Sequence, residues 1–355
     1  MEQETARPLI LWNGFPACGL LLKKLLKAYP GTPVFATRPG VPFENLEQHL
    51  GQEIHWLQSA NDICQYEDQL EDRNIIVSSG WIHKEWMRIS NSLKSKNNAV
   101  RIGVVDNSIK NNLRQFLGGL YFRAVLRQQF DAMFVPGKHG EQLLERWGMP
   151  PERIYPGAYG AFEEIYRDTN PILNRKNEIL FVGQLIERKG VDVMLRAFKR
   201  YRSDGGSWTL RVVGSGALES SCHGDGILFD GFLQPNEVSS AMNQSKAFIL
   251  PSREEHWGTV VCEAAACGSF LITTKEVGSS ADLVRRGVNG IELQNLKEFD
   301  LYSAFWSIQR STDQSLETAS RVSKALASTY DSDSYLAAFN RMATDFGLGT
   351  RSSGD

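Results

Sequence analysis

The stretch Ser252-Arg-Glu-Glu-His-Trp-Gly-Thr-Val-Val-Cys-Glu-Ala-Ala-Ala-Cys-Gly268 decides the fold class of this 355-residue chain. Before it, the apolar run Ala247-Phe-Ile-Leu250 ends at Pro251 and predicts a buried strand. A helix of small residues is predicted from about Thr259, with Gly268 as its C-terminal cap. A buried strand, a loop and a helix in this order are typical of a parallel α/β sheet. Such sheets bind ligands at the carboxyl ends of their strands.

Two glutamates stand in this stretch with seven residues between them. Glu255 is predicted in the loop at the carboxyl end of the strand, and Glu263 one turn into the helix. The start of a helix favours anions because its first N–H groups have no partner within the helix. Taken alone, the pair is equally consistent with two solvated helix glutamates.

The surroundings of the two glutamates carry a family resemblance. The pair Trp257-Gly258 lies between them, and Ala264-x-x-x-Gly268 follows. This pattern resembles the donor-site signature of the retaining nucleotide-sugar glycosyltransferases of family 4 (glycosyl transferases group 1), which have the GT-B fold. The resemblance implies that Glu255 binds the hydroxyls of the donor sugar and Glu263 those of the ribose.

A second motif, Gly183-Gln-Leu-Ile-Glu-Arg-Lys-Gly190, follows the predicted strand Glu178–Val182. It resembles the family pattern Gly-Arg-x-x-x-x-Lys-Gly, whose two cations neutralise the diphosphate of the nucleotide. Lys189 matches the lysine, whereas Gln184 replaces the arginine and carries no charge. Arg188 is a candidate for the missing charge.

Further residues follow from the same resemblance, which covers residues 179–293 closely. Gly214 and Gly216 are expected near phosphate, Gly231-Phe232 near the nucleobase, and Gly278-Ser279 where the family usually has two glycines. Each of these is otherwise an ordinary tight turn. The complete predicted donor site comprises Gly183, Gln184, Arg188, Lys189, Gly214, Gly216, Phe232, Glu255, Trp257, Gly258, Thr259 and Glu263.

The first half of the chain matches the family only in its alternation of strands and helices. Predicted strands begin at Leu9, Val34, Ile54, Asn74, Arg101 and Ala132. Gly14, His83 and Asp106 follow three of these strands and are candidates for the acceptor side, with Asp106 also a catalytic candidate. The alternatives are a tight turn at Gly14, a surface histidine at His83 and a helix N-cap at Asp106.

The fold expected from this resemblance is α/β and of the GT-B type. It has two Rossmann-like, doubly wound domains that face each other across a cleft. The first domain is expected over residues 1–165 and the second, which binds the donor, over residues 166–330. A last helix at about 331–346 is expected to cross back to the first domain.

Composition restricts the class of protein further. Lysine plus arginine number 39 against 41 acidic residues, so no basic field indicates nucleic acid. The five cysteines are scattered and predict neither a disulfide framework nor a zinc site. No acidic cluster accompanies the donor motifs, and no cofactor or metal is expected. The start of the chain does not resemble a signal peptide and no run reaches the length of a membrane span, which favours a cytoplasmic protein.

The segment 110–127 is basic and interleaved with leucine and aromatic residues. Such a segment is consistent with an anionic membrane surface or a lipid-linked acceptor, and equally with an ordinary helix packed on the sheet. Peripheral association with the inner face of a membrane is therefore an expectation. The pair Gly118-Gly119 predicts a break between two helical pieces.

The function expected from the resemblance is retaining, metal-independent transfer of a hexose. The sugar would pass from a nucleotide diphosphate-sugar to an acceptor hydroxyl on a glycan or lipid, in bacterial cell-surface polysaccharide or glycolipid synthesis. Lys189, Glu255 and Asp106 are the expected catalytic residues. A non-catalytic nucleotide-sugar-binding module and a glycoside hydrolase with paired carboxylates are alternatives.

Overall fold

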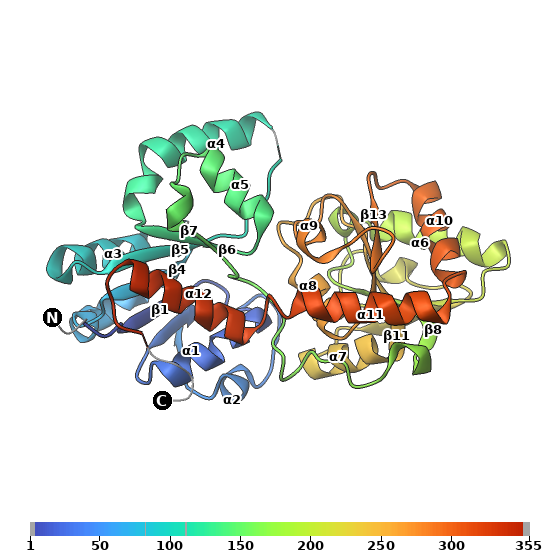
Figure 1. Cartoon of the computed structure of the whole chain (residues 1–355), viewed down its shortest axis with the longest axis horizontal. Coiled ribbons are helices and arrows are strands. Elements are labelled where there is room, and N and C mark those ends of the chain that lie inside the picture. Colours follow the sequence, from blue (N-terminus) through green and yellow to red (C-terminus); the bar gives the residue numbers. More distant parts are fainter. Residues whose placement is uncertain (1–3, 82, 111, 351–355) are drawn as a thin grey trace. The chain divides into compact units, whose positions relative to one another are not determined.

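The computed structural model describes residues 4–350 except 82 and 111. Its residues form two compact units. The first holds residues 1–159 and 332–355, and the second holds residues 160–331. Each unit is a parallel β-sheet with helices on both of its sides (Figure 1). The architecture is therefore two Rossmann-like α/β domains, as the resemblance predicted.

The sheet of the first unit has seven strands in the order β3-β2-β1-β4-β5-β6-β7, and every pair of neighbours is parallel. The third-second-first-fourth order is that of dinucleotide-binding sheets, with a switch point between β1 and β4. The strands are β1 Pro8–Trp12, β2 Val34–Thr37, β3 His55–Leu57, β4 Ile75–Ser79, β5 Val100–Val104, β6 Ala132–Val135 and β7 Ile154–Pro156.

The sheet of the second unit has six parallel strands in the order β10-β9-β8-β11-β12-β13. Counted from its own first strand, this order repeats that of the first unit, so its switch point lies between β8 and β11. The strands are β8 Lys176–Val182, β9 Thr209–Val213, β10 Ile227–Gly231, β11 Ser245–Leu250, β12 Phe270–Thr274 and β13 Gly290–Leu293.

The helices connect consecutive strands of each sheet, as in a doubly wound fold. Helix α12, the last in the chain, groups with the first unit and packs against α1. The first unit contains α1 Leu22–Ala28, α2 Leu46–Leu50, the 3₁₀ helix η2 Ala60–Leu70, α3 Lys84–Asn97, α4 Leu113–Ala124, α5 Lys138–Arg146 and α12 Ser332–Asp345. The second contains α6 Val191–Ser203, α7 Pro235–Gln244, α8 Thr259–Ala266, α9 Ser280–Leu283, α10 Glu298–Gln309 and α11 Asp313–Ala327.

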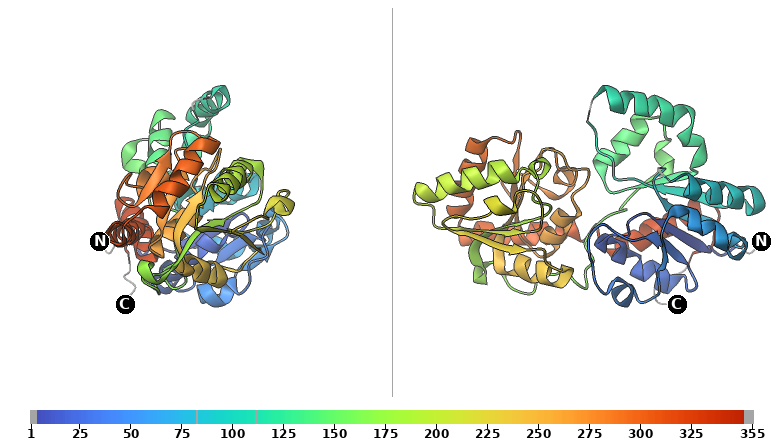
Figure 2. Two further views of the ribbon diagram at one scale, coloured as in Figure 1. Left: turned by 90° about the vertical axis from the view of Figure 1, so that its right-hand side faces the viewer. Right: turned by 180° about the vertical axis from the view of Figure 1, so that it is seen from behind.

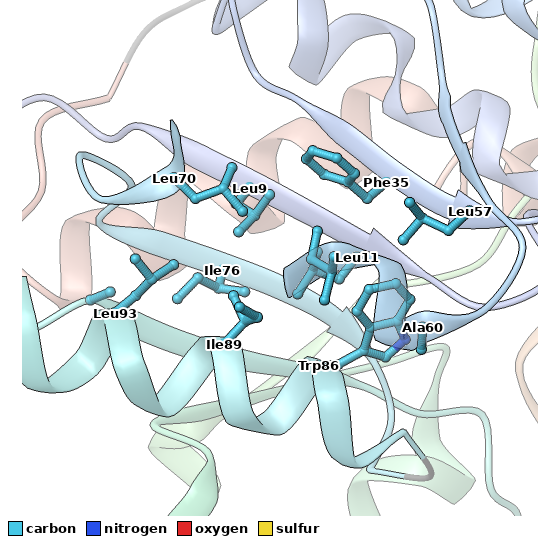
Figure 3. Close-up of a cluster of buried hydrophobic side chains, with 12 residues drawn as sticks. Leu9, Leu11, Phe35, Leu57, Ala60, Leu70, Ile76, Trp86, Ile89 and Leu93 are labelled. Atoms are coloured by element: carbon cyan, nitrogen blue, oxygen red, sulfur yellow. The ribbon is translucent and has the colours of Figure 1, made fainter. Parts of the chain in front are cut away.

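The core beneath α3 shows how the apolar pattern positions an element. Trp86, Ile89 and Leu93 recur at helical spacing, so one stripe of α3 faces the sheet. Figure 3 shows them against the strand residues Leu11 and Ile76. Burying each large apolar side chain contributes about 1.5–3 kcal/mol. This packing holds the carboxyl end of β4 rigid, where α3 begins.

Two short strands and one continuous helix differ from the expectation. The strands β7 and β13 were not predicted, because each has only three or four residues and no clear alternation. Helix α4 runs unbroken through Gly118-Gly119, so the predicted break there is wrong. A β-carbon on Gly119 would lie 2.4 Å from the ring of Trp147. Gly119 therefore allows close packing, and the helix ends only at Val125.

Candidate functional site

The carboxyl edge of the second sheet brings the two predicted donor motifs together. Lys189 lies in the turn Glu187–Lys189 that follows β8, and Glu255 lies in the loop that follows β11. Because β8 and β11 are neighbours, the two loops leave the sheet side by side at its switch point. The two motifs are 66 residues apart in sequence, and only the strand order makes them adjacent.

An ion pair joins these loops. The ammonium group of Lys189 donates to Oε2 of Glu255, and the two side chains are 12 % and 13 % exposed. Nη1 of Arg188 lies 3.7 Å from the same oxygen and donates to the carbonyl of Glu254 at 2.8 Å. Two cations therefore face one carboxylate. Arg188 supplies positive charge that the exposed Gln184 lacks.

A second bridge, from the loop after β11 to the first turn of α6, was not anticipated from the sequence. Nη1 and Nη2 of Arg253 donate to the two carboxylate oxygens of Asp192, at 2.7 and 2.8 Å. These hydrogen bonds lower the pKa of Asp192 below its ordinary value. The backbone N–H of Arg253 also donates to the carbonyl of Arg188. An Arg–carboxylate pair of this bidentate kind orients both partners, so it holds Arg188 and Lys189 in register with Glu255.

The glycines after β8 and β9 allow two loops to approach each other closely. A β-carbon on Gly214 would lie 1.9 Å from the carbonyl oxygen of Gly183, and one on Gly216 would lie 2.6 Å from that of Leu185. Gly214 and Gly216 also have positive φ values of 137° and 152°. Only glycine fits both conditions. The predicted phosphate-binding glycines therefore let the loops after β8 and β9 pack closely against each other.

The loop after β11 is also fastened to the loop after β12. Glu255 receives a hydrogen bond from the N–H of Gly278 at 3.1 Å, and Trp257 receives one from the N–H of Ser279 at 2.9 Å, both on their carbonyl oxygens. The indole of Trp257 is buried and packs against Tyr330. Trp257 thus supports the loop from within.

Buried polar atoms without a protein partner gather in this loop. Within residues 4–350, less 82 and 111, they include Oγ of Ser252, Nδ1 of His256 and Nε1 of Trp257. A buried polar group without a hydrogen bond costs free energy, so such groups mark places where a ligand or water binds. Sequence reasoning did not single out Ser252 or His256, because a lone serine or histidine in a loop carries no pattern.

Helix α8 begins at the same place. Its N-cap is Gly258, with a φ of 83°, and its first helical residue is Thr259. The N-cap glycine has no side chain that could cap this end, and the start of a helix favours anions. Glu263 lies one turn further and is buried. Burial raises the pKa of Glu263 to about 8, against a hydrogen bond from Tyr166 that lowers it.

The carboxyl edge of the first sheet carries hydroxyls and amides. The N–H of Gly14 donates to Oγ1 of Thr37 at 2.7 Å, and the N–H of Asn13 donates to Oγ of Ser79 at 2.8 Å. These bonds tie the end of β1 to the ends of β2 and β4. Gly14 has a φ of 58°, which suits glycine. The turn is therefore a rigid, neutral, polar surface at the switch point of this sheet.

Two further candidates lie on this edge. His83 is the residue before α3, and its buried Nε2 has no hydrogen-bond partner among the described residues. Asp106 follows β5 and lies close enough to Tyr159 to affect it. Burial, then the charge of Asp106, raise the pKa of Tyr159 well above its ordinary value. Both candidates follow strands β4 and β5, which are neighbours in the sheet.

The predicted site residues thus divide between two edges. The second unit gathers Gly183, Arg188, Lys189, Gly214, Gly216, Glu255, Gly258, Thr259 and Glu263 around β8, β9 and β11. Phe232 follows β10, the edge strand, and is partly exposed. Gly14, His83 and Asp106 belong to the first unit. No group of three or more metal-binding side chains lies together in the part of the chain that the structure describes.

Solved structures of other proteins have the same fold as this chain. The Anabaena protein HepE, solved in complex with UDP and glucose, superposes with a TM-score of 0.73 at 15 % identity, covering 95 % of this chain and 99 % of that one. At this identity the likeness shows the fold alone. The chain has the two-domain GT-B architecture.

Sequence comparisons then show which proteins the chain is similar to. Residues 162–298 match the model of the family Glycosyl transferases group 1. An uncharacterized glycosyltransferase of Methanocaldococcus jannaschii is 30 % identical over 242 residues, which are 64 % of this chain and 66 % of that protein. The capsular polysaccharide biosynthesis glycosyltransferase CapM of Staphylococcus aureus is 29 % identical over 144 residues, covering 36 % and 37 %. The aligned segments thus span only part of these relatives.

Proposed function

We propose that this protein is a retaining glycosyltransferase that uses a nucleotide diphosphate-sugar as its donor. The observation that carries the proposal is the cluster of Lys189, Arg188 and Glu255 at the β8/β11 switch point. The family of the second domain and the UDP bound to HepE support it. The finer parts of the proposal, retention and independence of a metal, rest on the resemblance of the two donor motifs.

In the proposed donor site, the bound diphosphate replaces Glu255 as the partner of Lys189. Without a donor, Glu255 is the partner of Lys189. A bound diphosphate brings its own negative charge to Lys189, Arg188 and the first N–H groups of α8, which releases Glu255 to accept hydrogen bonds from hydroxyls of the sugar. Donors arranged in this way stabilise the charge that develops on the departing phosphate.

The chemical step exchanges one bond of the anomeric carbon for another and transfers one proton. The acceptor hydroxyl oxygen bonds to the anomeric carbon, the bond from that carbon to the phosphate oxygen breaks, and the hydroxyl proton passes to the leaving diphosphate. Attack on the face that the diphosphate leaves retains the configuration. We assign the acceptor to the polar edge of the first unit, where Gly14, His83 and Asp106 lie.

We further propose that the acceptor is a glycan or a lipid-linked glycan of a cell-surface polysaccharide pathway. The relative CapM, by its description a glycosyltransferase of capsular polysaccharide biosynthesis, supports this assignment. A carboxylate such as that of Asp106 suits an acceptor rich in hydroxyl groups.

The test begins with nucleotide binding. Thermal unfolding is measured with UDP, GDP and ADP and with their glucose and galactose conjugates, because a ligand that binds the folded state raises Tm. Lys189→Ala should lose the shift. Lys246→Ala, at the amino end of β11, is the matched control and should keep it. Proton NMR of the transfer product then reports the anomeric configuration.

Three outcomes would contradict the proposal. Release of free sugar from a glycan without any nucleotide would indicate a glycoside hydrolase. Tight nucleotide binding with neither transfer nor hydrolysis would indicate a binding module. An inverted product would refute retention.

Metal dependence has its own test. We expect transfer to continue at its normal rate in EDTA, because Lys189, Arg188 and the start of α8 supply the positive charge. Transfer that stops in EDTA and returns with magnesium or manganese would contradict this part of the proposal.

A further inference from the structure

Helix α4 exposes a continuous apolar surface. Among the described residues, six large hydrophobic side chains from position 113 to position 125 are exposed. Phe116, for example, is 63 % exposed. Their spacing follows the helix repeat, so they form one stripe. In the views of Figures 1 and 2, α4 lies at the outer margin of the first unit with α5 beneath it. The six are Leu113, Phe116, Leu117, Leu120, Tyr121 and Val125.

The stripe is not needed to attach the helix to its own domain. The opposite face of α4 is also apolar and does this, since Phe122 is buried and packs against Trp147 and Trp81 at ring distances of 5.4 and 5.5 Å. Gly119 lets the helix approach Trp147 closely. A helix that is apolar on both faces requires a second partner for the outer face.

A groove extends the apolar surface toward α5. It has a volume of about 590 Å³, and Phe116, Leu120, Leu143 and Trp147 are among the residues that line it. This volume lies within the range of ligand pockets. The surface available to a partner therefore includes both the stripe and the groove beside it.

Positive charge surrounds the stripe. Residues 107–130 contain four basic residues and no acidic one. At about 100° per residue along a helix, Arg114 and Arg123 lie on opposite edges of the stripe. Arg123 and Arg127 donate to the carbonyl oxygens of Arg146 and Gly148, at 3.2 and 3.0 Å. These acceptors are neutral, so the bonds orient the two cations without cancelling their charge.

We propose that α4, with the groove and the arginines beside it, is the surface by which this protein docks on an anionic lipid bilayer. The helix has 12 residues and is therefore about 18 Å long, short of the ~30 Å of a bilayer core. It lies flat in the interface, with the stripe among the acyl chains and the arginines at the lipid phosphates. The described residues contain no helix long and apolar enough to cross a membrane.

Charge decides between this partner and a second copy of the chain. Two copies that met through α4 would bring their arginines together with no acidic residue of 107–130 between them, and like charges repel. An anionic surface complements the same arginines. The inference rests on this surface alone and does not depend on the proposed transfer of sugar.

Co-sedimentation tests the inference on the full chain. The vesicles consist either of phosphatidylcholine alone or of equal parts phosphatidylcholine and phosphatidylglycerol. The wild type should sediment with the mixed vesicles and much less with the neutral ones. Replacing Arg114, Arg123 and Arg127 by glutamine should weaken binding about fivefold for each charge removed. The triple variant Phe116→Ser, Leu117→Ser, Leu120→Ser should abolish measurable binding.

The chain offers a matched control for the apolar variant. Phe299 in α10 is exposed to 63 %, as Phe116 is, and Leu228 and Val288 are also exposed. The variant Phe299→Ser, Leu228→Ser, Val288→Ser should bind vesicles like the wild type. In a separate variant, Tyr121→Trp, the fluorescence of the new indole should shift to shorter wavelength on mixed vesicles alone.

Several results would overturn the inference. One is a wild type that does not bind mixed vesicles, and another is an α4 serine variant that binds as well as the control. Equal binding to both vesicle types would refute the role of the arginines. A dimer that the α4 substitutions dissociate, without vesicle binding, would make the surface a contact between copies of this chain.

Discussion

The carboxyl edges of the two sheets share a strand order and differ in chemistry. At the switch point of the second unit, Lys189 and Arg188 face Glu255, and the start of α8, with Gly258 as its N-cap, adds the positive end of a helix dipole. At that of the first unit, Gly14 and its neighbours form hydrogen bonds between neutral groups. The same topology thus presents two cations at one switch point and neutral hydrogen-bonding groups at the other. The loops, and not the sheet, determine which ligand each edge can bind.

The difference supports the proposed assignment of the two substrates. A diphosphate carries charge that must be neutralised, which the second edge can do. An acceptor hydroxyl carries none, and groups such as amides and hydroxyls suffice to orient it. Variants in each unit should therefore affect different steps of the reaction.

The largest effect is expected from Lys189→Ala. This change removes the less exposed of the two cations that face Glu255 from the place where negative charge develops in the proposed reaction. Loss of one such group typically costs ~3 kcal/mol of transition-state stabilisation, or about a hundredfold in kcat/KM. Steady-state transfer assays measure it. Arg188→Ala should have a smaller effect, because its side chain is 41 % exposed. If Arg188→Ala abolished transfer while Lys189→Ala kept it, the roles of the two residues would be reversed.

The next effect concerns pH and Glu263. If the ribose hydroxyls bind the ionised carboxylate, a pKa of about 8 means that nucleotide affinity falls by about tenfold for each pH unit below that value. Isothermal titration between pH 6 and 9 (about two units below and one above) measures this. Glu263→Gln should bind more weakly and without the pH dependence. A wild type whose affinity does not change with pH would show that this carboxylate does not bind the ribose.

Without nucleotide, the stability of the protein should also depend on the ionisation of Glu263. In this case the protonated form is the favourable one. The pKa of Glu263 is raised from 4.5 to about 8 on folding. Between these values the folded state holds the proton more tightly, so stability falls as pH rises through this window. At pH 8, Glu263→Gln should therefore have a higher free energy of unfolding, by ~4 kcal/mol. Urea titrations at pH 5 and pH 8 (near the two ends of the window) compare the two proteins.

A smaller effect is expected where a glycine lets two loops touch. A β-carbon on Gly278 would lie 1.9 Å from the carbonyl oxygen of His256, whereas one on Gly40 of the first unit has nothing within 4 Å. Gly278→Ala should lower the free energy of unfolding by about 1–3 kcal/mol and weaken nucleotide binding. Gly40→Ala is the control and should change neither. Equal stability of both variants in urea would show that the loops can separate freely.

The smallest effect on the donor is expected from Asp106→Asn, because Asp106 belongs to the other edge. Nucleotide affinity, measured by titration, should stay within about twofold of the wild type. The KM for the acceptor should rise, since an amide accepts fewer hydrogen bonds than a carboxylate. A large loss of nucleotide affinity in this variant would contradict the proposal that each unit binds one of the two substrates.

Local patterns were sufficient to predict much of this molecule. The apolar runs that became β1, β8 and β11 were recognisable because buried parallel strands are nearly continuous in Val, Ile, Leu and Phe. The loops after β8 and β11 were recognisable from Lys189 and Glu255 in their motifs. Because parallel strands end at a common edge, a motif at the end of a strand predicts the edge on which a site lies.

Tertiary structure decided what depends on residues far apart in the chain. Lys189 pairs with Glu255 because β8 and β11 are neighbours in the sheet. The pKa of Glu263 follows from burial that no local pattern describes. The pair Gly118-Gly119 predicted a break, but the helix continues through it. Gly119 packs closely against Trp147, a contact that no local pattern describes. The basic segment 110–127 was equally consistent with a membrane or lipid-binding surface and with an ordinary helix packed on the sheet. Only packing on Phe122 determined that the leucine-rich face of α4 points outward, since apolar spacing defines a stripe but not the partner that covers it.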